Sequence, residues 1–193
     1  MPFKKLAKKL KTPKQVQVYL RSLPYNREKG KATLRSAHSA LKVGRAHCFE
    51  AAFLAAAILE NHGYPPLVIS FESQDGLDHV IFVFQEKEKW GAVARSRDEG
   101  LHGRPPIYKS IKDLAMSYFE PYVDLTGKIT AFQIAHLDDS KSNWRTSPRN
   151  VWKAENYLLE IKHFKLKVSQ KRYKKLLEEY KKRGPMARKS HWW

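Results

Sequence analysis

One apolar segment near the middle of the chain limits the possible folds more than any other feature. Residues 48–59 read CFEAAFLAAAIL, in which Ala and Leu, both strong helix formers, take most positions. Such a helix is apolar nearly all round, so other elements must enclose it. We expect the helix to run from Arg45 to His62, because Gly63 is typical of a helix end and Pro65–Pro66 prevents continuation.

The segments after this helix predict an antiparallel sheet. Residues 79–85, HVIFVFQ, are apolar on both faces, which is typical of a central strand. The charged residues 86–89 predict a hairpin turn, and the partner strand is expected at 90–96. Further strands are expected at 67–71 and 128–136, a loop at 97–106, and helices at 13–22, 111–119 and, singly or as a pair, across 151–183. The sequence therefore predicts an α+β fold in which the buried helix packs on an antiparallel sheet.

Cys48 and His79 are the residues whose positions predict chemistry. Cys48 begins the buried helix, where free N–H groups and the positive end of the helix dipole favour the thiolate form. His79 opens the central strand, and we expect it to lie beside that helix end as the general base. The alternative interpretation is a packed core thiol and a structural histidine, because free cysteines are often buried and inert.

A Cys–His pair needs a third group that orients the imidazole. If Gln85 pairs with Trp90 in the hairpin, His79 faces Ser96. Ser96 is then one candidate acceptor. Asp98 lies on the same face of the strand and is the other candidate, provided that the strand end curls or a bulge shifts the register.

These residues resemble the core of the transglutaminase-like (papain-like) cysteine hydrolase superfamily. The similarity lies in the run Gly44-Arg45-Ala46-His47-Cys48-Phe49-Glu50-Ala51-Ala52, the turn Gly63-Tyr64-Pro65, and then His79 and Trp90. It covers residues 44–98, and it implies a papain-like α+β core with a Cys-His-Asp triad, Cys48 as nucleophile and His79 as base. The sequence departs from the family pattern at the third position, because the family's Asp falls near Ala94. The run from Arg95 to Arg104 is also similar to a run in bacterial proteins, which points to a bacterial branch.

Three neighbouring residues are candidates for substrate binding. Arg95 and Arg97 carry guanidinium groups next to the expected site and are suited to bind an anion or carboxylate. The alternative for Arg97 is an internal ion pair with Asp98 in a solvated loop. His47 is expected to border the cleft and not to act as the base of Cys48, since adjacent helical residues point about 100° apart.

The charge of the chain is concentrated at its ends. The net charge is +18, and residues 1–14 carry +6 while residues 162–193 carry +10. Basic tails bind nucleic acid or another polyanion without sequence specificity. This gives the competing interpretation, a catalytically degenerate binding module that docks on a polyanion. The predicted organisation is a basic segment at 1–14, the core at 15–145 and a basic helical extension at 146–193.

The remaining features indicate where the protein is located and whether it uses a cofactor. No apolar run is long enough for a transmembrane helix, and the first residues lack the apolar region of a secretory signal. A lone cysteine is typical of a reducing compartment, so we expect a cytoplasmic protein. The histidines do not follow a metal-binding spacing, and no phosphate loop or dinucleotide fingerprint is present. We expect no metal and no cofactor, and a peptide or protein as substrate: a thiol-dependent hydrolase or acyl transferase acting on a peptide-like amide.

Overall fold

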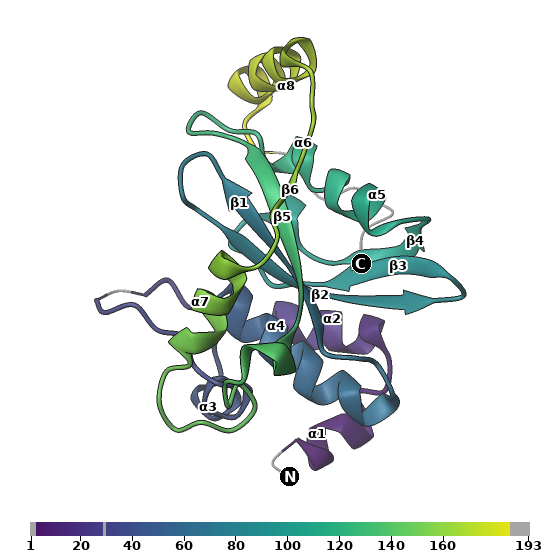
Figure 1. Ribbon diagram of the computed structural model, residues 1–193, viewed down its shortest axis with the longest axis vertical. Helices are drawn as coiled ribbons and strands as arrows, with labels where there is room; N and C mark the ends of the chain where they lie inside the picture. The colour runs from purple at the N-terminus through teal and green to yellow at the C-terminus, as the bar shows by residue number, and fades with distance from the viewer. Residues whose placement is uncertain (1–2, 29, 186–193) are drawn as a thin grey trace.

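The computed structural model describes residues 3–28 and 30–185 (Figure 1). The helices are α1 (Lys4–Lys9), α2 (Pro13–Ser22), α3 (Ala37–Val43), α4 (Cys48–Leu59), α5 (Ile111–Met116), α6 (Phe119–Tyr122), α7 (Trp152–Glu160) and α8 (Gln170–Arg183). The strands are β1 (Leu67–Ser73), β2 (His79–Glu86), β3 (Lys89–Val93), β4 (Arg104–Tyr108), β5 (Ile129–His136) and β6 (Phe164–Lys165). The predicted α+β class is confirmed.

The strands of the described chain form one antiparallel sheet in the order β4-β3-β2-β1-β5-β6. The predicted pairing of Gln85 with Trp90 is confirmed, and β2 lies in the interior of the sheet. Lys87 and Glu88 form the hairpin turn with φ of 46° and 61°, the left-handed region that two-residue hairpins of this twist require. The expectation of a loop at 97–106 is wrong in part, because β4 begins at Arg104. β4 is an edge strand, where proline is tolerated.

Alternating side chains divide the core between the two faces of the sheet. Val80 and Phe82 pack into the cluster that contains α4, and Ile81 and Val83 pack into a second cluster with residues of α5 and α6. Every residue of α4 from Phe49 to Leu59 is buried, and Figure 1 shows α1, α2, α3 and α7 around it. The predicted enclosure of this helix is confirmed. Cys48, in its first turn, is the one residue of α4 that is not fully buried.

The predicted ends of α2 and α4 follow from their capping residues. Thr12 and Gln15 form a capping box at the start of α2, and Pro13 takes the first helical position. At the other end of α4, a 3₁₀ turn (Glu60–His62) leads into Gly63, whose φ of 84° places it in the left-handed region. α2 therefore has its predicted bounds, whereas the predicted start of α4 at Arg45 is wrong, because His47 takes the N-cap position and the helix begins at Cys48.

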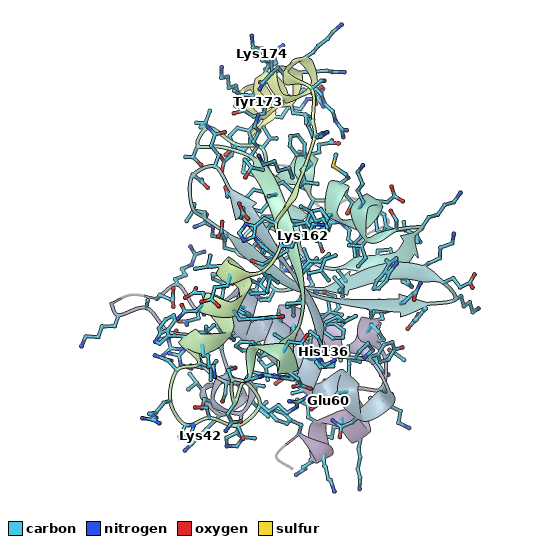
Figure 2. The ribbon with its side chains drawn as sticks, in the orientation of Figure 1. Lys42, Glu60, His136, Lys162, Tyr173 and Lys174 are labelled. Carbon is cyan, nitrogen blue, oxygen red and sulfur yellow. The ribbon has the colours of Figure 1, made fainter. Side chains whose placement is uncertain are left out.

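The basic C-terminal segment is anchored to the fold. Tyr173, Leu176 and Leu177 of α8 pack against the second core cluster. Figure 2 shows Tyr173 and Lys174 at one end of the molecule, with Lys42 near the opposite end. None of the described helices combines the length and apolarity needed to cross a membrane. The division at residues 14 and 145 stays a prediction, and parts of both predicted tails (1–2 and 186–193) lie outside the described residues.

Candidate active site

Cys48 lies at the first position of α4, with His47 as the N-cap residue. The Nδ1 atom of His47 accepts a hydrogen bond from the Phe49 N–H at 3.2 Å, and the Glu50 carboxylate accepts one from the His47 N–H at 3.1 Å. Cys48 as a residue is half-buried, while the rest of the helix is buried. Cys48 therefore combines a fixed backbone with a place at the positive end of the helix dipole.

His79 begins β2 and is only 3% exposed. Its ring packs near Phe71 and Tyr118, with ring centroids 6.4 and 6.2 Å away. The Nε2 atom lies 2.9 Å from the carbonyl oxygen of Leu101. A carbonyl only accepts, so Nε2 carries the hydrogen and Nδ1 is left as the basic nitrogen.

The structure brings Cys48 and His79 together. The thiol is hydrogen-bonded to the side chains of both His79 and His47. Burial opposes ionisation of the thiol, but these bonds and the positive charge of the two imidazoles hold the pKa of Cys48 well below its ordinary value. The arrangement favours the thiolate, which is the nucleophilic form.

A backbone carbonyl, and not a side chain, contacts the far side of the His79 ring. The β2–β3 ladder ends at the pair Phe82 and Val93, so the register that would place Ser96 opposite His79 does not continue that far. Ser96 is buried, and its Oγ accepts a hydrogen bond from the Asp98 N–H at 3.1 Å. Both residues belong to the turn that leads to Leu101, and Leu101 supplies the acceptor instead.

Tyr25 also reaches the nucleophile. The segment around it forms a parallel bridge with Ala46, and the Asn26 N–H donates to the Ala46 carbonyl at 3.1 Å. This bridge brings the Tyr25 hydroxyl to the backbone N–H of Cys48, which is hydrogen-bonded to it. Burial, followed by the nearby Cys48 charge, raises the pKa of Tyr25, so the hydroxyl keeps its proton. The Tyr25 oxygen accepts this hydrogen bond from the Cys48 N–H, and the Tyr25 O–H is itself a donor near the sulfur.

These groups open into a cleft with a volume of about 780 Å³. Its walls come from the segment 25–34, the start of α4, the loops before β2 and after β3, and from α7 and the end of α8. Among the described residues that line it, carboxylates outnumber guanidinium groups; the acidic residues are Glu28, Asp75, Asp78, Asp98, Asp124 and Glu155, and the basic ones are Arg27 and Arg97. This described lining is therefore acidic, although the protein as a whole is strongly basic.

The two candidate arginines differ in position. Arg97 lines the cleft, and its Nε donates to the Asp98 carboxylate at 3.3 Å. Arg95 lies outside the cleft wall: its Nε donates to the Leu23 carbonyl at 3.2 Å, and its guanidinium stacks 5.6 Å from the Tyr25 ring centre. Arg95 therefore supports the ring of Tyr25, and of the two candidates Arg97 is the one that lines the cleft.

A family comparison agrees with this arrangement. The vasohibin family model matches residues 2–183, which is nearly the whole chain. The chain belongs to the vasohibin family. Vasohibins are proteins with a transglutaminase-like cysteine protease fold, so the superfamily that the motif around Cys48 indicated is the right one. No curated protein matches the chain in sequence.

Three features of this vasohibin-family site were not anticipated from the sequence. The Leu101 carbonyl carries no residue signature, and Tyr25 lies nineteen residues before the motif begins at Gly44. The argument that His47 points away from Cys48 is wrong, because His47 is the N-cap residue with extended backbone (φ −84°, ψ −177°) and not a helical residue. Its N-cap position, directly before a cysteine, was the available signal.

Proposed function

We propose that the protein is a thiol-dependent hydrolase that cleaves a peptide-like amide, with Cys48 as nucleophile and His79 as proton carrier. The observation that supports this best is the position of Cys48, a half-buried residue that lines a cleft, begins a helix and has its thiol hydrogen-bonded to His79. A buried structural thiol would not combine these features. The family's cysteine-protease-like fold is consistent with this function.

The proposed reaction uses the groups in turn. The thiol proton passes to Nδ1 of His79, and the sulfur attacks the amide carbon. The negative oxygen that forms is stabilised by the Tyr25 O–H, whose own oxygen accepts from the Cys48 N–H, in the manner of an oxyanion-hole donor. His79 then gives its proton to the leaving amine, and the C–N bond breaks to leave a thioester on Cys48.

Water completes the proposed cycle. Neutral His79 removes a proton from water, the hydroxide attacks the thioester, and the sulfur leaves as thiolate. The Leu101 carbonyl keeps the His79 ring in the required tautomer throughout, which is the part that an Asp plays in the common triad. If an amine replaces water, the same thioester gives an acyl transfer, so the two outcomes share every step before this one.

Other cleft residues have proposed roles in holding the substrate. Ser96 and Asp98 shape the turn that presents the Leu101 carbonyl, since the Asp98 N–H is tied to Ser96 Oγ. Arg97 is the proposed contact for a substrate carboxylate or carbonyl, in competition with its ion pair to Asp98. Arg95 acts through Tyr25. The cytoplasmic location and the bacterial branch stay predictions.

A peptide screen with an active-site trap tests the proposal. We expect the wild-type protein to release amines from a library of peptides that carry either Lys and Arg or Asp and Glu around each amide. A thioester on Cys48 should be detected by mass spectrometry after acid quenching, and Cys48→Ala should give neither signal. Because the cleft is rich in carboxylates, the cationic peptides should be cleaved faster at low salt. Equal turnover by Cys48→Ala would rule the proposal out.

Polyanion binding by the basic ends is the alternative function, and one observation favours it. The side chains of Tyr173, Leu176 and Leu177 fix α8 to the core, and Lys128 stacks on the Tyr173 ring at 4.1 Å. Lys171, Lys174 and Lys175 are exposed on the same helix. A fixed row of exposed lysines is suited to phosphate groups spaced along a backbone.

Charge reversal on α8 tests this alternative. We expect the triple change Lys171→Glu, Lys174→Glu and Lys175→Glu to weaken single-stranded RNA binding about tenfold or more, because each lysine releases counterions on contact. The slope of log affinity against log salt, measured by fluorescence anisotropy, should become shallower by about two. The matched control reverses Lys42, Lys112 and Lys153, which are exposed and lie outside the charge-rich residues 1–14 and 162–193. If both triple variants lost the same RNA affinity, the net charge of the protein alone would account for binding, and α8 would have no specific role.

A further inference from the structure

Cys48 has two histidine neighbours, and the proposed reaction uses only one of them. The Nε2 atom of His47 lies 2.8 Å from the Thr33 carbonyl oxygen. As for His79 and the Leu101 carbonyl, this contact fixes the hydrogen on Nε2 and leaves Nδ1 to face the start of α4. Both rings are thus held by a backbone carbonyl and are hydrogen-bonded to the thiol.

The surroundings of His47 favour its charged form. The Nε2 atom lies 3.7 Å from a Glu50 oxygen and 3.9 Å from a Glu28 oxygen, and Glu155 of α7 adds negative potential. Burial alone would lower the pKa of His47, but the Cys48 thiolate, Glu50 and the Thr33 carbonyl together raise it to about 9. These contacts favour the imidazolium form of the ring at neutral pH.

We propose that His47 is a second catalytic histidine, which stays protonated through the cycle and stabilises the Cys48 sulfur as a thiolate while His79 alone moves protons. This assignment rests on the proposed thiol-dependent function. When His47 is protonated, Nδ1 donates to the sulfur in place of accepting from the Phe49 N–H. His47 begins and ends the cycle with the same protons, so the proton balance of the reaction is unchanged.

Two histidines with different roles suit the hydrolysis of the thioester better than one histidine does. During thioester hydrolysis His79 receives the proton of water, and the sulfur must leave at the same stage as an anion. A second, fixed positive charge lowers the free energy of that anion without competing for the proton. His47 is placed for this because its ring is held by Thr33 and its backbone by Glu50.

The test compares two substitutions that separate charge from capping. His47→Asn keeps a good N-cap side chain and removes the charge, and His47→Lys keeps the charge and removes the cap. We measure the rate of Cys48 alkylation by iodoacetamide from pH 4 to 10, with thermal unfolding to confirm that each variant is folded. We expect the apparent pKa of the thiol to rise by about one unit or more in His47→Asn, a loss of about tenfold in rate at pH 6, and to stay low in His47→Lys.

His79→Ala completes the comparison. We expect its thiol to remain more acidic than the ordinary value of about 8.5, because His47 is still present, and the change of both histidines should restore that value. A wild-type alkylation profile in His47→Asn, with the ordinary value already reached in His79→Ala, would overturn the assignment. Alkylation needs no substrate, so a low thiol pKa that depends on His47 supports the assignment even if every peptide proves inert, whereas inert peptides alone count against the proposed hydrolase.

Discussion

The His79→Ala variant is expected to lose peptide turnover by about 10²- to 10⁴-fold, the usual effect of removing a positioned general acid–base group. The reason is geometric, because His79 is the imidazole whose second nitrogen is fixed by the Leu101 carbonyl at 2.9 Å. The loss should fall on kcat, with little change in KM, since the ring is buried and its neighbours form the core. Steady-state kinetics with the best peptide from the screen gives both constants.

Two further measurements make this result specific to proton transfer. The control is His136→Ala, which removes a half-exposed imidazole at the end of β5 that lines no part of the cleft. It should leave turnover unchanged. A peptide with a better leaving group than an amine, such as an activated ester, should recover part of the lost rate in His79→Ala, because it needs less proton donation. If the ester loses as much rate as the amide, His79 has a structural role and not that of the acid.

Glu50→Ala is expected to have the largest effect on stability. The Glu50 carboxylate is completely buried beside Cys48. It accepts hydrogen bonds from the Arg35 N–H at 2.9 Å, the His47 N–H at 3.1 Å, the Thr33 hydroxyl at 3.2 Å and the Asn26 amide at 3.3 Å, and it pairs with the Arg35 guanidinium at 3.2 Å. Its removal leaves these donors and a partly buried positive charge without an acceptor. We expect a loss of about 3–5 kcal/mol in the free energy of unfolding.

Urea denaturation followed by circular dichroism measures this loss. Glu160→Ala, on the exposed side of α7, is the control and should change stability by about 0.5 kcal/mol or less. Glu50→Gln keeps the volume, but its amide nitrogen cannot accept, so an intermediate loss is expected. Because Glu50 also fixes the His47 backbone, Glu50→Gln should slow Cys48 alkylation at low pH even in conditions where it is fully folded. A loss below about 1 kcal/mol in Glu50→Ala would show that water replaces the carboxylate.

The sequence by itself determined the elements whose signals are local. The apolar run 48–59 required an enclosed helix, and the structure buries it. The apolar run in residues 79–85 and the charged turn at Lys87 and Glu88 determined the central hairpin and its register. The same local signals placed Cys48 at a helix start and His79 at a strand start, because capping residues and strand alternation depend on neighbours in the chain.

Only the tertiary structure decided which groups surround the thiol. The ladder between β2 and β3 stops at Val93, so the turn after it, and not the strand register, positions the Leu101 carbonyl on His79. The bridge from Tyr25 to Ala46 joins segments twenty-one positions apart. Backbone carbonyls and N–H groups occur at almost every residue, so nothing in the amino-acid types shows which of them will be used. The choice comes from long-range packing, which brings the segments together only when the chain has folded.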